Sequence, residues 1–178
     1  MERVFFWPYV RNDLLAREWA LPGTPGLMHR IGGIEKEDGT GNISYDPDNH
    51  GHMVDIRQAR VQRVEVPDVE LVGVEDPDLL VVGWGSTWGA ITGAVRRAVR
   101  DDLKIGHVHL RHLNPLPNNL GKVLSQAKQV VTAEMNLGQL SKILRAEYLI
   151  DVHPVTKVKG QPFTARELDE IIREAVNE

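Results

Sequence analysis

The feature that most constrains the fold is the alternation of strand and helix patterns in the second half of the chain. Residues 79–84, LLVVGW, form a short run that is apolar on both faces, which is typical of a strand inside a parallel sheet. Residues 86–101 follow with apolar positions at helical spacing, and Ser86 or Thr87 suits the N-cap position. This alternation predicts an α/β fold of three layers, a mainly parallel sheet with helices on both faces.

The same alternation continues towards the end of the chain. We expect further strands over residues 107–112, 129–134 and 149–155, and further helices over residues 118–127, 137–147 and 164–176. Thr164 and Glu167 form a capping-box pattern at the start of the last helix, which fixes where that helix begins.

Residues 1–49 are different, because they are rich in glycine and proline and have little periodicity. So long an irregular stretch is uncommon inside a compact domain. Its aromatic residues, expected to be exposed, favour a segment draped over a partner: Phe5, Phe6, Trp7, Tyr9 and Trp19. Residues 50–64 then have the pattern of an amphipathic helix. We therefore expect an irregular arm or inter-domain connector over residues 1–49 and an α/β domain over residues 50–178.

Composition excludes several classes of function. The net charge of -4 gives no bias towards nucleic acid or an anionic membrane, and no run is apolar enough for a signal peptide or a span. The 178 residues contain no cysteine, so this chain's own thiolates can form no disulfide, nucleophile or iron–sulfur cluster. We expect a cytoplasmic protein that has neither a nucleic-acid nor a membrane partner.

The turn between the first strand and the first helix of the alternation resembles a phosphate-binding loop. Its glycines, Gly83, Gly85 and Gly89, are spaced one residue wider than in the dinucleotide fingerprint, and no acidic residue for a ribose ends the next strand. We therefore expect steric roles: Gly85 closes the turn and Gly89 lets the helix approach the sheet. Gly85, Ser86 and Thr87 remain candidate cofactor-binding residues. Trp84 and Trp88 indicate packing or an interface rather than base stacking.

Other polar residues give weaker signals. His107 and His109 share one strand face and His112 lies beyond it, with no carboxylate at ligand spacing, so we expect no metal site. His50 and His52 are expected only at the start of a helix. Glu134 ends an apolar strand at the sheet edge where ligands bind, although capping of the next helix or a salt bridge is the favoured interpretation. No group of residues indicates catalysis.

Four blocks, in order, resemble the C-terminal part of the alpha subunit of 2-oxoacid:ferredoxin oxidoreductases, the 2-oxoglutarate type most of all. They are TPGLMHRIGGIEKEDGTGNISYDPDNHGHMVDIR (24–57), GWGSTWGAI (83–91), HLRHLNPLPNNLG (109–121) and AEMNLGQLSKILRAEYLIDVHPVTKVKGQPF (133–163). The resemblance covers nearly the whole chain. It implies a domain similar to the transketolase C-terminal domain, which helps to assemble the subunits.

The resemblance also implies the reaction of the whole enzyme, which decarboxylates a 2-oxoacid, forms acyl-coenzyme A and reduces ferredoxin. Thiamine diphosphate, Mg²⁺ and a [4Fe-4S] cluster are expected in other domains or subunits, and none of these cofactors is expected on this chain alone. The implied partners are the beta subunit and the remaining alpha-subunit domains, with ferredoxin reached through a homo- or hetero-oligomer. The chain begins in the middle of the family's pattern, so a fragment, a split subunit or a single domain all fit, and we expect no activity from it alone.

Within this resemblance, residues 24–49 would join this domain to its neighbour. His29 and Arg30 are the candidates there for contact with a substrate carboxylate or a coenzyme A phosphate, because arginine suits bidentate anion contacts, whereas a purely structural tether is the alternative. Two other functions stay open. One is a free-standing module that binds a nucleotide or coenzyme A at the Gly83–Gly89 turn. The other is a structural dimerisation domain that uses the aromatic N-terminal arm.

Overall fold

A computed structural model describes residues 6–176, and the chain divides into two compact units, Met1–Glu65 and Val66–Glu178. The first helix, α1 (Pro47–Gln62), belongs to the N-terminal unit. The division expected between residues 49 and 50 therefore falls inside this helix. Helix α1 belongs to the N-terminal unit because it contacts residues that precede it. Glu35 accepts hydrogen bonds from Arg57 and pairs with His50, and Asp38 pairs with His52.

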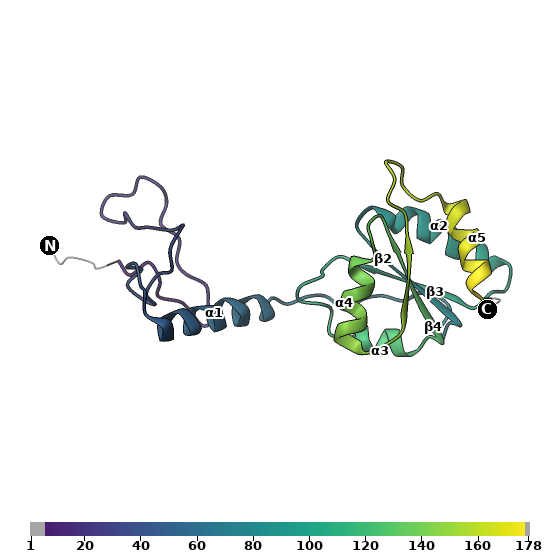
Figure 1. Cartoon of the computed structure of the whole chain (residues 1–178), viewed down its shortest axis with the longest axis horizontal. Coiled ribbons are helices and arrows are strands. Elements are labelled where there is room, and N and C mark those ends of the chain that lie inside the picture. Colours follow the sequence, from purple (N-terminus) through teal and green to yellow (C-terminus); the bar gives the residue numbers. More distant parts are fainter. Residues whose placement is uncertain (1–5, 177–178) are drawn as a thin grey trace. The chain divides into compact units, whose positions relative to one another are not determined.

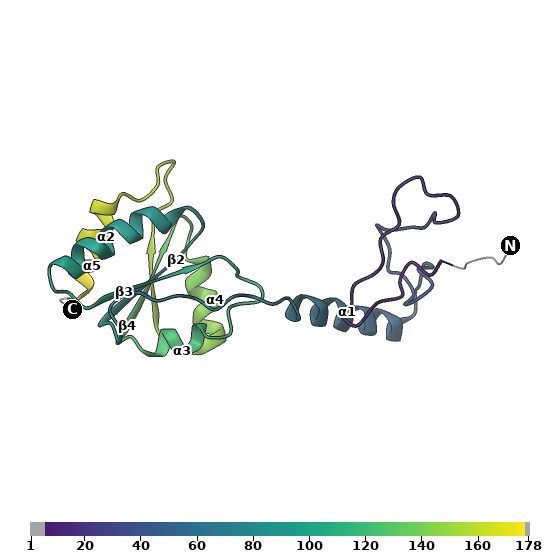
Figure 2. The same ribbon diagram turned by 180° about the vertical axis from the view of Figure 1, so that it is seen from behind.

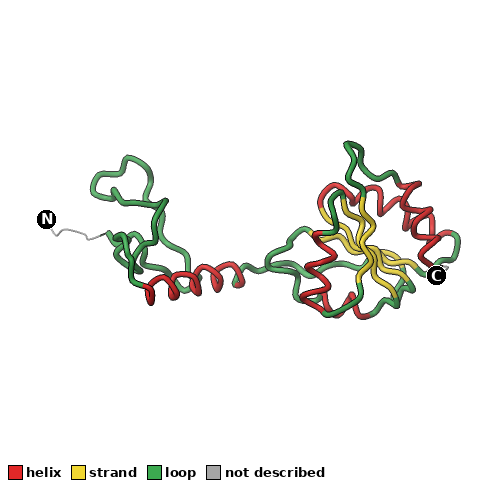
Figure 3. Tube along the Cα trace, in the orientation of Figure 1, coloured by secondary structure: helices red, strands yellow, loops and turns green. Residues whose placement is uncertain are grey.

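The N-terminal unit is mainly loop with one helix, as the green and red tube of Figure 3 shows. Isolated β-bridges join Tyr9 to Gly39, Arg11 to Arg17 and Lys36 to Ile43. The Lys36 ammonium is buried and donates to the carbonyls of Gly32 and Ile34, so the loop before it is held by one side chain. Residues 6–46 are thus irregular in secondary structure, as expected, yet bound together.

Two expectations for this unit were wrong in part. Tyr9 is not exposed: only 7% of it is accessible, and the Arg17 guanidinium lies 4.2 Å above its ring. Trp7 and Trp19 are exposed as expected, whereas Phe5 lies outside the described residues. Helix α1 forms, but Met53 is its one fully buried residue, so its amphipathic character is weak.

The C-terminal unit contains a five-stranded sheet in the order β1-β3-β2-β4-β5. The parallel strands are β2 (Leu79–Trp84), β3 (Ile105–Leu110), β4 (Gln129–Glu134) and β5 (Val152–Thr156). The edge strand β1 (Val72–Gly73) pairs antiparallel with β3, with Val72 opposite His107. The sequence pattern did not predict β1, because two residues are too few to show alternation.

Helices cover both faces of this sheet, as Figures 1 and 2 show from opposite sides. Helices α2 (Trp88–Arg100) and α5 (Ala165–Val176) pack on one face around Leu79, Val81 and Ile91. Helices α3 (Leu120–Ser125) and α4 (Gln139–Tyr148) pack on the other around Leu80, Val82 and Val108. The alternation of Leu79 to Val82 between two cores explains why this strand is apolar throughout. The three-layer α/β prediction is confirmed.

The element boundaries agree closely, with informative shifts. Strand β4 has the predicted limits, and the capping box is present, since Glu167 accepts from the Thr164 amide at 2.7 Å and the Glu167 amide donates to Thr164 Oγ1 at 3.1 Å. Strand β3 begins two residues earlier than predicted, because Gly106 interrupts the apolar pattern. A Cβ at Gly106 would lie 2.8 Å from Leu71 Cδ1, so glycine is required by packing there.

Candidate functional site

The carboxyl ends of β2 and β4 define a crevice. The chain passes from β2 to β3 on one side and later returns to β4 on the other side of β2, so the strand order reverses at this point. Open α/β sheets bind ligands at such points. A pocket of about 250 Å³ lies here, lined by residues 84–87 and by Met135, Asn136 and Gln139. The predicted residues Gly85, Ser86 and Thr87 are thus brought together with the loop that follows β4.

The turn itself is built by backbone geometry and one hydroxyl. Gly85 has φ +60°, a conformation that favours glycine, and opens the short 3-10 helix η1 (Gly85–Thr87). Thr87 Oγ1 donates to the Trp84 carbonyl at 3.0 Å and accepts from the Trp84 amide at 3.3 Å. Thr87 occupies the N-cap position of α2, but its hydroxyl makes no capping bond there. The predicted steric role of Gly85 agrees with this geometry.

The close approach of α2 to the sheet depends on Gly83 and not on Gly89. A Cβ at Gly83 would lie 2.2 Å from Ile91 Cδ1 and 2.9 Å from Thr87 Oγ1, whereas a Cβ at Gly89 would meet nothing within 4 Å. The role predicted for Gly89 was therefore wrong. The sequence signal for Gly83 was its place on the same strand face as Leu79 and Val81, opposite the helix that follows.

The two tryptophans beside the turn differ. Trp84 is half-buried and packs against the core under α3 and α4. Trp88 is 56% exposed at the start of α2. The prediction of packing therefore agrees with Trp84, and Trp88 leaves an indole available at the surface of the C-terminal unit.

Glu134 is a capping residue. It is fully buried, and its carboxylate accepts from the amides of Leu140 at 2.7 Å and Ser141 at 2.9 Å and from Thr132 Oγ1 at 2.9 Å. The amides belong to the first turn of α4, where a negative charge is favourable. All of these donors are internal, and Glu134 is not among the residues that line the switch-point crevice, so its role is to cap α4.

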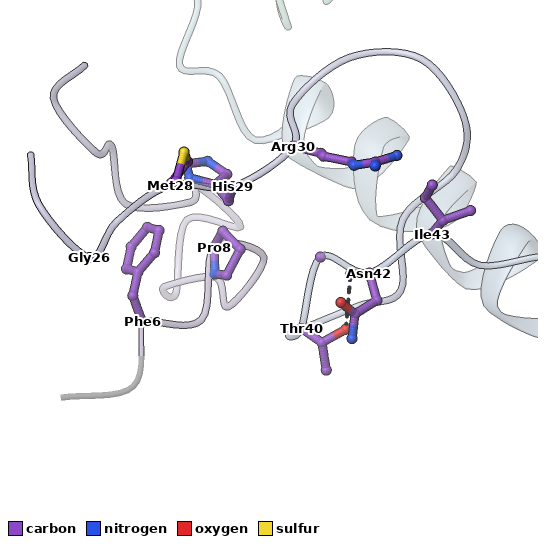
Figure 4. A pocket seen from close by; sticks show the side chains of 10 residues that line it. Phe6, Pro8, Gly26, Met28, His29, Arg30, Thr40, Asn42 and Ile43 are labelled. Atoms are coloured by element: carbon purple, nitrogen blue, oxygen red, sulfur yellow. Dashed lines mark hydrogen bonds between the residues drawn. The ribbon is translucent and has the colours of Figure 1, made fainter. Parts of the chain in front are cut away.

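The second candidate region is a pocket of about 450 Å³ in the N-terminal unit (Figure 4). Both predicted anion-contact residues line it, His29 near Phe6 and Met28, and Arg30 beside Ile43. His29 Nδ1 lies 2.8 Å from the Leu27 carbonyl, and its ring meets Phe6 edge-on with centroids 5.3 Å apart. Because a carbonyl only accepts, Nδ1 carries a proton and Nε2 is left for a ligand.

The remaining wall of this pocket is polar. The Asn42 amide donates to Thr40 Oγ1 at 3.1 Å, which closes a turn in the pocket lining (Figure 4). The exposed Arg30 guanidinium supplies the positive charge among the lining residues. An anionic group such as a carboxylate or phosphate fits this donor set.

The histidines are distributed as predicted on β3. His107 and His109 share the face under α2, in T-shaped contact with ring centroids 5.8 Å apart, and His112 lies beyond the strand. Burial lowers the pKa of His107 to about 4, with His109 adding to the effect. Across residues 6–176 no group of three or more potential ligands could hold a metal ion. No helix within the same range is both long and apolar enough to cross a membrane.

The fold defines a mainly parallel α/β domain with a crevice at its topological switch point. The family model for the pyruvate:ferredoxin oxidoreductase core domain II matches residues 77–168, and the chain belongs to this family. The predicted resemblance is thereby confirmed.

Curated relatives specify the type. The chain is 53% identical over 176 residues to the 2-oxoglutarate oxidoreductase subunit KorA of Mycobacterium tuberculosis, covering 96% of this chain and 26% of that protein. It is 33% identical over 153 residues to the alpha subunit of 2-oxoacid:ferredoxin oxidoreductase 1 of Aeropyrum pernix, covering 80% of this chain and 24% of that protein. The chain thus spans about a quarter of the length of these relatives.

Solved structures agree. The 2-oxoglutarate:ferredoxin oxidoreductase of Magnetococcus marinus, solved with 2-oxoglutarate, coenzyme A and succinyl-CoA, has a TM-score of 0.82 and 30% identity, covering 94% of this chain and 30% of that one. A split-gene transketolase, an inactive beta4 tetramer, has a TM-score of 0.50 and 20% identity over 65% of this chain and 44% of that one. The second likeness concerns the fold alone.

Proposed function

We propose that this chain is the C-terminal part of an alpha subunit of a 2-oxoglutarate:ferredoxin oxidoreductase. The observation that carries the proposal is the 53% identity to the Mycobacterium tuberculosis subunit over 176 residues. The whole enzyme converts 2-oxoglutarate to an acyl-coenzyme A and passes electrons to ferredoxin. This part frames the active site and assembles the subunits, and is inactive alone.

The surface of the N-terminal unit supports the assembly role. Large apolar side chains are exposed between residues 19 and 34, including Trp19 at 89% and Met28 at 97%, with Leu21, Ile31 and Ile34. Such a concentration of exposed apolar residues marks a surface that another protein segment covers. The beta subunit or another part of the alpha subunit is the partner we propose. The alternative is that two copies of this chain form a dimer through the N-terminal arm.

The cofactors of such an enzyme fit this chain unequally. A [4Fe-4S] cluster does not fit, because the chain has no cysteine. The switch-point pocket has no cationic side chain in its lining, which makes it a poor site for a diphosphate. The pocket with His29 and Arg30 does fit a coenzyme A phosphate or a substrate carboxylate. We therefore assign thiamine diphosphate, Mg²⁺ and the cluster to other parts of the enzyme, and an anion contact to Arg30.

Kinetics of the assembled enzyme test this contact. Arg30→Gln removes the charge and keeps most of the side-chain length, so the KM for coenzyme A or for 2-oxoglutarate should rise by about ten-fold or more, as for loss of a charge-assisted hydrogen bond. Arg166→Gln is the matched control, because Arg166 is exposed on α5 and pairs with Glu170. Unchanged KM values for both substrates in the Arg30 variant would assign the residue to the structural tether.

The alternative function is a free-standing module that binds a nucleotide or coenzyme A at the Gly83–Gly89 turn, where backbone amides instead of cations would have to hold the phosphates. The pocket lies where such sheets bind ligands, and the Ser86 hydroxyl is exposed beside it. Protection of the Ser86 and Thr87 amides when coenzyme A is added to the chain would support this function. Unchanged amide signals at saturating coenzyme A would remove it.

A further inference from the structure

A group of buried polar atoms in the C-terminal unit has no hydrogen-bond partner. Within residues 6–176 they include Thr92 Oγ1, both ring nitrogens of His107 and Nδ1 of His109. These four atoms lie between α2 and β3. Buried polar groups in folded proteins are nearly always paired, so four unpaired atoms in one place indicate a missing partner.

Two adjoining hollows meet at His107. One, of about 310 Å³, is lined by Trp88, His107 and His109, and the other, of about 160 Å³, by Thr92, Val95 and His107. Val72 of the edge strand lines both. Only 1% of His107 is accessible, so its ring forms the floor that the two hollows share. We call this combined space the β1–α2 trench.

The local sequence explains why the trench is open. Val81 and Val72 flank His107 on the neighbouring strands, but β1 begins only at Val72 and runs antiparallel to β3, so the sheet margin beside His109 has no paired strand. Helix α2 covers the face above with Thr92 and Val95, and α5 packs on the other side of α2. Residues 67–70 form the outer wall. The trench is therefore separate from the switch-point crevice and from the pocket of His29.

The unpaired atoms restrict the chemistry of an occupant. Burial holds the pKa of His107 well below neutrality, so the ring is neutral and presents one donor and one acceptor. The Thr92 hydroxyl can likewise donate and accept. An ammonium supplies donors alone, and a phosphate brings a negative charge that the neutral His107 ring and the Thr92 hydroxyl do not balance, so neither suits this set. Beside this set, Trp88, Val72 and Val95 supply aromatic and aliphatic wall, which suits a flat ring, whereas the charged lining residues are Arg96 in the smaller hollow and Asp68, Glu70 and Arg111 in the larger one.

We propose that the β1–α2 trench binds a small planar nitrogen heterocycle whose buried end is uncharged and offers both a hydrogen-bond donor and an acceptor to Thr92 and His107. This site goes beyond the proposed function, since it involves neither the switch-point crevice nor the Arg30 pocket. Arg111 lines the larger of the two hollows, where its positive charge suits an anionic substituent at the outer end of the ligand.

The test is an NMR titration of the full chain, labelled with ¹⁵N in its histidine rings, with adenosine and with nicotinamide as probes and inorganic phosphate as the contrast. At least one of the two heterocycles should shift both His107 ring nitrogens saturably, and phosphate should not. Thr92→Val keeps the shape and removes the hydroxyl, so it should weaken binding by about five-fold or more. Thr156→Val is the matched control at the opposite edge of the sheet, on the exposed side of β5, and should bind as the unmodified chain does.

Three results would overturn the proposed site. Absence of any His107 shift with both heterocycles at millimolar concentration would overturn the site and leave water as the partner of these atoms. Equal binding by the Thr92→Val variant would also overturn it, as would shifts confined to the Ser86 and Thr87 amides. The His107 signals of the unmodified chain decide the matter even if a variant fails to fold.

Discussion

At the scale of single residues, Gly83 leaves no room for a side chain between β2 and α2. Gly83→Ala would place a methyl group 2.2 Å from Ile91 Cδ1, and α2 would have to move away from the sheet. We expect a loss of about 1 to 3 kcal/mol in the free energy of unfolding, as for overpacking elsewhere. Native-state amide exchange of β2 and α2 measures this loss in the C-terminal unit alone.

Gly89→Ala is the control for this change. A Cβ there meets nothing within 4 Å and the residue lies in α2, so stability should stay the same or rise by up to about 1 kcal/mol. Equal exchange rates in the two variants would contradict the packing role of Gly83.

Glu134 gives the second prediction at this scale. Glu134→Gln keeps the shape of the side chain but replaces one carboxylate oxygen with an NH₂ group. In the unmodified chain both oxygens accept from backbone amides, and one also accepts from the Thr132 hydroxyl, so the NH₂ group would face a donor. We expect a loss of about 1 to 3 kcal/mol, the cost of buried donors left without an acceptor. Urea unfolding followed by circular dichroism measures it. The exposed Glu147, changed to Gln, should cause no comparable loss, and an equal effect of both changes would argue against capping by Glu134.

These residues also show how far the sequence could predict the site. The position of Glu134 at the end of an apolar strand indicated capping, because charge and helix start were both visible in the sequence. The strand face of Gly83 could be inferred from the sequence, but its crowding could not, because it depends on where Ile91 and Thr87 meet the strand in three dimensions. His29 and Arg30 are neighbours in sequence, yet only the fold shows that Phe6 and Asn42 complete their pocket.

At the scale of elements, the last helix depends on an ion pair as well as on its capping box. Lys157 Nζ lies 2.7 Å from Glu167 Oε1. This hydrogen bond is the main cause that lowers the pKa of Glu167 from its usual 4.5 to about 2, and the hydrogen bonds from Thr164 add to the effect. A carboxylate whose pKa is lower in the folded state than in the unfolded state stabilises the folded state at pH values above the unfolded-state pKa. The contribution is lost as the pH falls from about 4.5 through about 2.

Thermal unfolding tests this prediction. The midpoint of the unmodified chain should exceed that of Glu167→Gln at neutral pH, and the difference should shrink steadily below pH 4.5. Glu170→Gln, which affects only the exposed pair with Arg166, is the control and should show a smaller dependence on pH. A difference between the unmodified chain and Glu167→Gln that stays constant down to pH 2 would show that the ion pair does not stabilise α5.

Most elements of the C-terminal unit could be predicted because their periodicity follows directly from burial. Strand β2 is apolar on both faces, and α5 combines a capping box with a strong apolar face. Strand β1 could not be predicted, since its two residues pair only because β3 presents a free edge. Helix α1 has one fully buried residue, so its sequence gave no sign that charged contacts with Glu35 and Asp38 place it in the N-terminal unit.

At the scale of the whole molecule, the chain spans about a quarter of the length of its curated relatives. Its exposed apolar side chains fit a part of a larger assembly. The N-terminal unit carries the pocket of His29 and Arg30, and the C-terminal unit carries a crevice and a trench. Under the function we propose, this part contributes contacts and no reacting group, and catalysis takes place in the assembled enzyme.

The most direct test of this account is the rate of coenzyme A-dependent ferredoxin reduction with 2-oxoglutarate as substrate. It is measured for this chain alone, for the remaining alpha and beta components without it, and for all of them together. The account predicts no turnover by the chain, little by the remaining components, and full activity when they are combined. Turnover by the chain alone, or an assembly equally active without it, would contradict the central claim.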